Sequence, residues 1–126
     1  MTKSYHISRI TLAMIWLYHG LVPKLLFASR QEIEMNEKLL PFLTEKQALW
    51  GSGIAEVLLA LAYIIFYRSK WLNFPMITFA TLATLSLIFT HSHFFTLAFN
   101  PFSINLAVVS LAWINVSEFN KGKTYE

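Results

Sequence analysis

Cysteine is absent from this chain, and charged residues make up only 13% of its 126 positions. Without cysteine, the chain cannot form disulfides, thiol redox relays, thiolate zinc sites, iron–sulfur clusters or a covalently attached c-type haem. Soluble domains carry about 25% charged residues. A chain this short cannot bury 56% hydrophobic residues in a core of its own. The composition therefore predicts an integral membrane protein.

Long apolar segments, by contrast, are plentiful. A helix needs about 20 predominantly apolar residues to cross the hydrocarbon of a bilayer. Four segments meet this requirement, at about residues 7–27, 48–67, 72–90 and 103–119. We expect an all-α fold, an integral membrane four-helix bundle that forms a single transmembrane domain over residues 1–126.

The first of these segments has some features of a secretory signal peptide, with basic residues in front and "FAS" behind. Its apolar run, however, exceeds the usual ~7–15 residues of a signal peptide. It also contains His19, Pro23 and Lys24. We therefore interpret it as a retained helix.

Residues 28–47 connect the first two segments and alternate apolar with charged side chains in "SRQEIEMNEKLLPFLTEKQ". Such a pattern is typical of an amphipathic helix that lies on a membrane surface. Pro41 divides the stretch into two short pieces. A solvated loop and a lid over the bundle are both compatible with this pattern.

Basic residues are distributed unevenly between the two ends of the predicted bundle. One end holds Lys3, Arg9, Arg68, Lys70, Lys121 and Lys123, and the other holds Lys24, Arg30, Lys38 and Lys46 among four glutamates. The positive-inside rule then places both termini in the cytoplasm. The net charge of +3 lacks the concentrated basic face that nucleic-acid binding needs, so we expect no nucleic-acid partner.

Polar residues converge on the outer half of the predicted bundle. By helical rise, His19 lies roughly 10 Å below the outer end of the first segment, and Glu56 roughly 12 Å below the outer end of the second. Ionisable groups at such depth usually face the bundle interior. Other polar residues close the third segment or open the fourth near this level: His91, His93, Asn100 and Asn105.

Several interpretations of these residues remain open. His19 and Glu56 can form a register-fixing hydrogen bond, relay protons or bind a polar headgroup. His91 and His93 can face water, or His91 alone can join the site. A metal centre of His19, Glu56 and His91 is chemically admissible but not demanded by the spacing, and a bis-histidine b-haem is a weaker alternative. Arg9 is most simply a topology determinant.

Small and hydroxyl residues recur at helical spacing and predict the packing seams. On the second segment the stripe is Ser52, Glu56, Leu59 and Tyr63; on the third it is Thr81, Thr84, Ile88 and His91; on the fourth it is Ser103, Ala107, Ser110, Ile114 and Ser117.

The motifs "WLYHGLVPKLLF" and "WGSGIAEVLLAL" resemble those of the DoxX-like family of small bacterial membrane proteins. The resemblance extends over nearly the whole chain. It implies a four-helix protein of the bacterial inner (plasma) membrane, whose relatives are associated with quinone-linked oxidoreductase complexes, some as membrane modules beside nucleotide-binding domains. On this analogy His19, Lys24 and Glu56 are the site candidates.

We expect a membrane subunit that binds a quinone or another lipid-soluble ligand in support of redox chemistry. Glu56, His19 and His91 would supply the polar contacts, Lys24 would supply positive charge, and aromatic rings would flank the ligand: Trp16, Tyr18 and Trp50. We expect no intrinsic cofactor and no metal site, with membrane lipids, a redox partner subunit and a homo-oligomer as candidate partners. A non-catalytic scaffold and a small homodimeric transporter are the alternatives.

Overall fold

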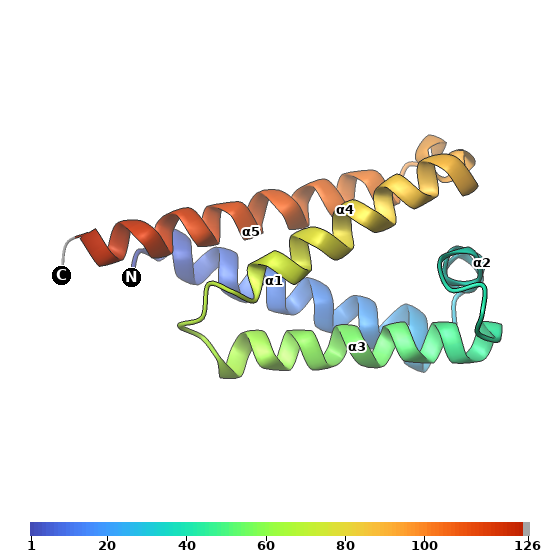
Figure 1. The fold of residues 1–126 in the computed structure, drawn as a ribbon, viewed down its shortest axis with the longest axis horizontal. Helices are drawn as coiled ribbons and strands as arrows, with labels where there is room; N and C mark the ends of the chain where they lie inside the picture. The colour runs from blue at the N-terminus through green and yellow to red at the C-terminus, as the bar shows by residue number, and fades with distance from the viewer. Residues whose placement is uncertain (125–126) are drawn as a thin grey trace.

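The computed structural model describes residues 1–124, and the side chains of residues 38–39 and 122–124, Lys123 among them, lie outside the description. The helices run in the order α1 (Lys3–Gly20), η1 (Leu21–Leu26), α2 (Arg30–Leu39), α3 (Glu45–Ile65), α4 (Asn73–Thr90), η2 (Ser92–Thr96) and α5 (Pro101–Thr124) (Figure 1). No strand occurs among the described residues. The all-α fold expected from the sequence is confirmed.

Polar caps extend the helices beyond the apolar segments on which the sequence prediction rested. The side chain of Thr2 accepts a hydrogen bond from the backbone of Tyr5, so α1 begins at Lys3 instead of near residue 7. Thr44 and Gln47 form a capping box, so α3 begins at Glu45 instead of near residue 48. These capped turns carry the helices past the hydrocarbon into the polar boundary of a membrane.

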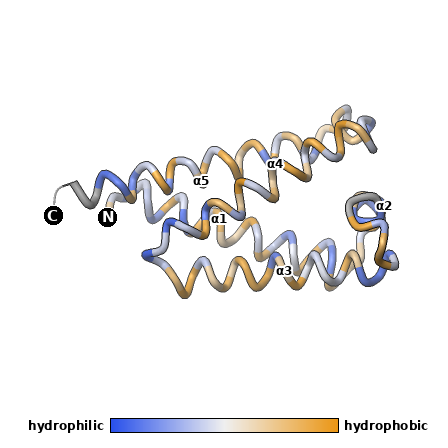
Figure 2. Tube along the Cα trace, in the orientation of Figure 1, coloured by the Kyte–Doolittle hydropathy of each residue, from blue (hydrophilic) through white to orange (hydrophobic). Residues whose placement is uncertain are grey.

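Three helices, α3, α4 and α5, are each long and apolar enough to cross a membrane. The first segment, Lys3–Leu26, supplies a fourth when it is counted together with the residues beyond its 98° bend into α2. Hydrophilic residues gather near the two ends of the bundle and on α2, with apolar residues between (Figure 2). The chain is an integral membrane protein with four helical segments.

The bundle consists of two helix pairs that diverge toward one end (Figure 1). Helix α1 packs between α3 and α5, and α4 packs along α5. Among the described residues, no Cα atom of α4 comes within 8 Å of one in α3. Helix α2 lies at the open end and contacts both α3 and α4. We call this the outer end, and the end with the start of α1 and the finish of α5 the inner end.

The core is built mainly from small and aromatic side chains of all four segments. Leu12 and Trp16 of α1 pack against Ala60 and Tyr63 of α3. The other helices contribute Met76, Ala80, Val108 and Ala112. Small residues at these positions let the helix backbones approach closely, which is how membrane helices associate.

The predicted seams of α4 and α5 were largely wrong. In α5, Ser103, Ala107, Ser110 and Ile114 are exposed, and in α4, Thr81 and Ile88 are exposed. A hydroxyl on a membrane helix can bond to its own backbone, as Thr90 does to the carbonyl of Ser86. A hydroxyl therefore does not need a partner helix, and the α5 seam follows Val108, Ala112 and Asn115 instead.

A buried polar network joins all four segments at the inner end. Asn115 donates to the carbonyl of Tyr5 and to the Ser8 hydroxyl, at 3.1 Å each. Its carbonyl accepts from Asn73 at 3.1 Å and from Arg9 at 3.5 Å. Asn73 in turn accepts a hydrogen bond from the Tyr63 hydroxyl. This network holds the two helix pairs together at their inner end.

Arg9 caps the last turn of α3 within this network. The guanidinium donates to the carbonyls of Tyr63 at 3.0 Å, Phe66 at 2.6 Å and Ser69 at 2.7 Å. It also lies 3.5 Å from the centroid of the Tyr63 ring. A cation at a helix C-terminus interacts favourably with the helix dipole. Interpreted from the sequence as a topology determinant, Arg9 is thus a buried cap with 1% of its surface exposed.

Candidate functional site

The outer half of the bundle is organised by a close crossing of α1 and α3. A Cβ atom on Gly20 would lie 2.7 Å from the carbonyl oxygen of Gly53 and 2.9 Å from a methyl group of Val57. A Cβ atom on Gly53 would lie 3.0 Å from the Gly20 carbonyl and from the Lys24 side chain. Only glycine permits this approach, so the crossing fixes the height of Lys24 relative to α3.

Directly after Gly20, the first segment widens into the π-helix η1. Pro23 lies within it and has no backbone N–H to donate, which disturbs the regular ladder. The N–H of Phe27 reaches back five residues to the carbonyl of Val22, at 3.1 Å. Ala28 then adopts a left-handed conformation with φ of 45°, where the chain turns into α2. Such wide turns are frequently found at functional sites.

Lys24 projects from η1 into the space between the helices. It is 5% exposed, and its ammonium group hydrogen-bonds to Oε1 of Glu56. It also lies 3.5 Å from Oε2 of Glu32 in α2. Lys24 therefore turns toward carboxylates in the bundle and does not extend to the outer headgroups.

The buried part of α2 holds Glu32 in place. Asn36 is 5% exposed and donates to the backbone carbonyl of Glu32 at 2.7 Å and to its carboxylate at 3.3 Å. The Ser29 side chain caps the helix by accepting from the Glu32 backbone at 3.3 Å. Glu32 thereby contacts Lys24 from the side of α2 and is the second carboxylate of the cluster.

A second contact of α2 joins it to the end of α4. Oε1 of Glu34 lies 3.6 Å from Nε2 of His91 and 3.7 Å from Nε2 of His93. His91 is buried at the C-terminus of α4, and His93 is exposed in η2. Through Glu32 and Glu34, α2 thus bridges the two helix pairs where α3 and α4 do not touch.

Two buried polar atoms in the outer half of the bundle have no hydrogen-bond partner in the described part of the chain: Oε2 of Glu56 and Nε1 of Trp16. Trp16 precedes Gly20 by four residues, and Glu56 follows Gly53 by three on the antiparallel helix. Both therefore lie about 5–6 Å inward of the glycine crossing. Buried polar atoms are nearly always paired, so these two atoms leave one acceptor and one donor of the outer half unused within the described chain.

The model of the DoxX-like family matches residues 13–113, a range that includes the glycine crossing, Lys24, Glu56 and all of α2. The chain belongs to the DoxX-like family. Comparison with curated proteins finds no match, and comparison with solved structures finds none either.

The structure brings only part of the predicted residue set of this DoxX-like protein together. Lys24 and Glu56 are in contact, and Trp16 lies on α1 at about the height of Glu56 by helical rise. The hydrogen-bond partner of Glu56 is Lys24, and no hydrogen bond joins His19 to Glu56 among the described residues. His19 is half-buried, stacks edge-on with Tyr18, and is subject to the charges of Glu32 and Lys24.

The remaining candidates lie farther out. Tyr18 is 59% exposed and Trp50 is 47% exposed, with Lys46 positioned over the Trp50 ring. His91 contacts Glu34 and not the Lys24–Glu56 pair. No group of three His, Cys, Asp or Glu side chains in the described part of the chain is placed to hold a metal ion. The alternative of a metal centre at His19, Glu56 and His91 thus gains no support.

Sequence reasoning did not assign Glu32, Glu34 or Asn36 to the site. They belong to the amphipathic connection, where a solvated loop and a lid were both open. The available signal was the Ser29-to-Glu32 spacing of a helix N-cap, which starts α2 and directs its first-turn carboxylate back toward η1.

Proposed function

We propose that this DoxX-like protein is a membrane subunit that binds a quinone, or another lipid-soluble ligand with an oxygen-bearing ring, in support of redox chemistry. The observation that carries the proposal is the unpaired Oε2 of Glu56, buried beside a carboxylate oxygen that Lys24 already holds. Leaving a buried carboxylate oxygen unpaired is costly unless another group satisfies it. A ligand hydroxyl would do so.

The donor and acceptor types of these residues would suit a quinone headgroup. Trp16 offers an N–H donor and Glu56 an acceptor at the same height, which suits a ring that carries a carbonyl in one redox state and a hydroxyl in the other. When bound, a quinone supplies a carrier of two electrons and two protons, with the electrons coming from a redox cofactor on a partner subunit. Specific polar contacts in an otherwise apolar environment are typical of such binding sites.

In this proposal each residue of the site has a separate role. Lys24 holds one oxygen of Glu56 and so orients the other toward the ligand. Glu56 accepts a hydrogen bond from the ligand and exchanges a proton with it. His19, half-buried one turn before Lys24, passes protons between this carboxylate and the outer surface. Tyr18 and Trp50 contact the ligand tail from the lipid side.

Native mass spectrometry of the gently solubilised protein, after incubation with ubiquinone, tests the proposal. We expect one retained quinone per chain, its loss in Glu56→Gln, and its retention in Glu45→Gln. Glu45 is an exposed residue of the same helix and serves as the matched control. An apo-protein at saturating ubiquinone would falsify quinone binding. The scaffold alternative would then predict impaired oligomers in Glu56→Ala, and the transporter alternative would predict proton-coupled flux in proteoliposomes.

We further propose that both termini face the cytoplasm of a bacterial cell, because the inner end carries six Lys and Arg residues in the sequence and the outer end carries four. The absence of cysteine makes this simple to test. Ser4→Cys and Thr44→Cys each place one thiol on an exposed residue at opposite ends. A membrane-impermeant maleimide added to whole spheroplasts should label Thr44→Cys only. Labelling of Ser4→Cys alone would reverse the orientation.

A further inference from the structure

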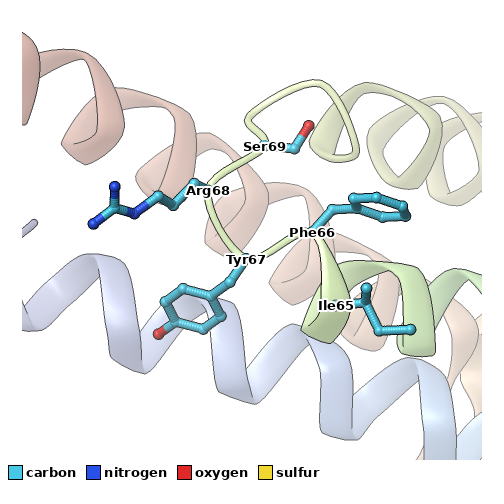
Figure 3. A pocket seen from close by; sticks show the side chains of 5 residues that line it. All are labelled: Ile65, Phe66, Tyr67, Arg68 and Ser69. Carbon is cyan, nitrogen blue, oxygen red and sulfur yellow. The ribbon is translucent and has the colours of Figure 1, made fainter.

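Two hollows adjoin each other toward the inner end, and neither is lined by Lys24 or Glu56. The first is a groove of about 210 Å³ between α1 and α3. It is lined by Arg9, Ile10, Ala13, Met14, Leu17, Tyr63, Ile64 and Tyr67. The second is a shallow hollow of about 400 Å³ along the loop after α3, lined by residues 65–69 (Figure 3). Tyr67 lines both and therefore joins them.

The groove has the form of a channel for a hydrocarbon chain. From Arg9 to Leu17 it follows eight residues of α1, about 12 Å at the helical rise. Ile10, Met14 and Ile64, on its rim, are each more than half exposed in the described structure. In a membrane protein such a rim meets lipid, and the groove leads from the inner boundary toward the middle of the bilayer. A lipid acyl chain matches both its polarity and its direction.

The head of the groove carries positive charge that no carboxylate of the described residues neutralises. Arg9, in its wall, donates only to neutral oxygens: three backbone carbonyls and the Asn115 amide. Arg68 is exposed, and it forms no hydrogen bond or ion pair with the rest of the described chain. Figure 3 shows its guanidinium extending outward from the loop, while the Tyr67 ring lies over α1. Glu118, an acid at this end, is already bound to Thr2 and Lys121.

Tyr67 is held where the apolar and charged parts meet. Its hydroxyl lies 2.6 Å from Nδ1 of His6, and the two rings stack at an interplanar angle of 19°. A phenol at the membrane boundary is well suited to contact a lipid headgroup, since its ring is apolar and its hydroxyl is polar.

We infer that these two hollows form a binding site for one anionic phospholipid. The acyl chain occupies the α1–α3 groove, and the phosphate lies between the Tyr67 hydroxyl and the Arg68 guanidinium. An anionic headgroup balances the charges of Arg68 and Arg9, whereas a zwitterionic headgroup brings an ammonium group of its own. Basic pockets between transmembrane helices bind anionic headgroups in this way, and one basic residue near the surface contributes about a fivefold preference.

Native mass spectrometry in mixed micelles, titrated with dioleoylphosphatidylglycerol or dioleoylphosphatidylcholine, measures this preference. We expect a single saturable phosphatidylglycerol, bound at least about fivefold more tightly than phosphatidylcholine. Arg68→Gln should reduce the two affinities to near parity. Arg30→Gln, the same substitution on an exposed residue at the outer end, is the control and should leave the preference unchanged.

A second variant tests the groove itself. Met14→Trp fills the groove from an exposed position and should weaken the binding of both lipids by a similar factor. Leu82→Trp, on the exposed face of α4, should weaken the binding of neither lipid. Equal binding of the two lipids by the wild-type protein would overturn the inference, as would a non-saturating series of bound lipids. Glu56→Gln should not alter lipid binding, so failure here and failure of the proposed quinone site are separate results.

Discussion

Both ends of the bundle bury polar side chains between helices, but they satisfy them differently. At the inner end, Asn115 uses its amide to make four hydrogen bonds to three other residues' side chains and one backbone carbonyl. At the outer end, Lys24 faces two carboxylates, and one oxygen of Glu56 is left unpaired. The inner network is closed within the chain, whereas the outer cluster is charged and incomplete.

Under the proposed function, this difference distinguishes polar groups that hold the fold from polar groups that bind a ligand. A saturated amide network fixes register and spacing between helices. A buried ion pair adds little net stability, because desolvation offsets much of the attraction. The proposed ligand site would account for an ion pair at the outer end that leaves one carboxylate oxygen unpaired. The following substitutions test that division, from the largest expected effect to the smallest.

Removing Lys24 should have the largest effect. Lys24→Met leaves Glu56 and Glu32 without their cation, and we expect a loss of about 3–5 kcal/mol in the free energy of unfolding. Replacing both members of the pair, in Lys24→Met with Glu56→Leu, should restore the stability to within about 1 kcal/mol of the wild type, because no buried charge of the pair is left alone. Denaturant unfolding in detergent, followed by tryptophan fluorescence, measures both. A double variant as unstable as the single one would assign the cluster a structural role.

Asn115→Leu should lower the free energy of unfolding by nearly as much, and no second substitution comparable to Glu56→Leu should restore it. It removes four hydrogen bonds worth about 1 kcal/mol each, so we expect a loss of about 3–4 kcal/mol. Asn105→Leu is the matched control, since Asn105 makes a single bond to Thr84 at 2.9 Å and should cost about 1 kcal/mol. The same unfolding assay applies. Equal losses at the two positions would show that the inner network is not a cooperative unit.

Gly20→Ala should have a smaller effect, which originates in packing. Its Cβ would meet the Gly53 carbonyl at 2.7 Å, so α1 and α3 must separate, at a cost of about 1–3 kcal/mol. At Gly51 a Cβ meets nothing within 4 Å, and Gly51→Ala should be neutral or stabilise by up to about 1 kcal/mol through helix propensity. Indistinguishable melting temperatures for the two variants would argue against the glycine crossing.

Ala28→Gly should give the smallest change, a stabilisation of about 1 kcal/mol or less. Ala28 has φ of 45°, a conformation that is costly for a residue with a Cβ and freely available to glycine. Part of the gain is offset by the greater entropy of glycine in the unfolded chain. Thermal melting of the two proteins side by side checks the sign, and a lower melting temperature for the variant would contradict it.

The membrane class, the helical segments and the motif around Pro23 and Lys24 could be predicted from the sequence because they depend on local composition. The outer position of Glu56 follows in the same way from helical rise. The hydrogen-bond partner of Glu56 could not be predicted from the sequence, because equal depth along two helices does not determine which helix faces meet. The glycine crossing turns Lys24, and not His19, toward Glu56.

Other features depended on tertiary packing that periodicity does not encode. Serine and threonine on α4 and α5 suggested seams, but a hydroxyl can bond within its own helix, as that of Thr90 does in α4, and can then face lipid. The inner network uses amides instead, at Asn73 and Asn115, which need partners on other helices. The sequence does not distinguish Arg9 from Arg68. Arg9 differs because the end of α3 folds back onto its guanidinium group, which is a tertiary contact.

The separation of α4 from α3 has a mechanical consequence. The amide network joins the two helix pairs at the inner end and α2 bridges them at the outer end, so the inner end would act as the pivot in any rotation of α4. Helix α4 has 18 residues and is about 27 Å long, and each degree of rotation about the inner end therefore displaces its far tip by about 0.5 Å. A shift at the pivot that is too small to break a hydrogen bond is thus amplified at the contact between Glu34 and His91.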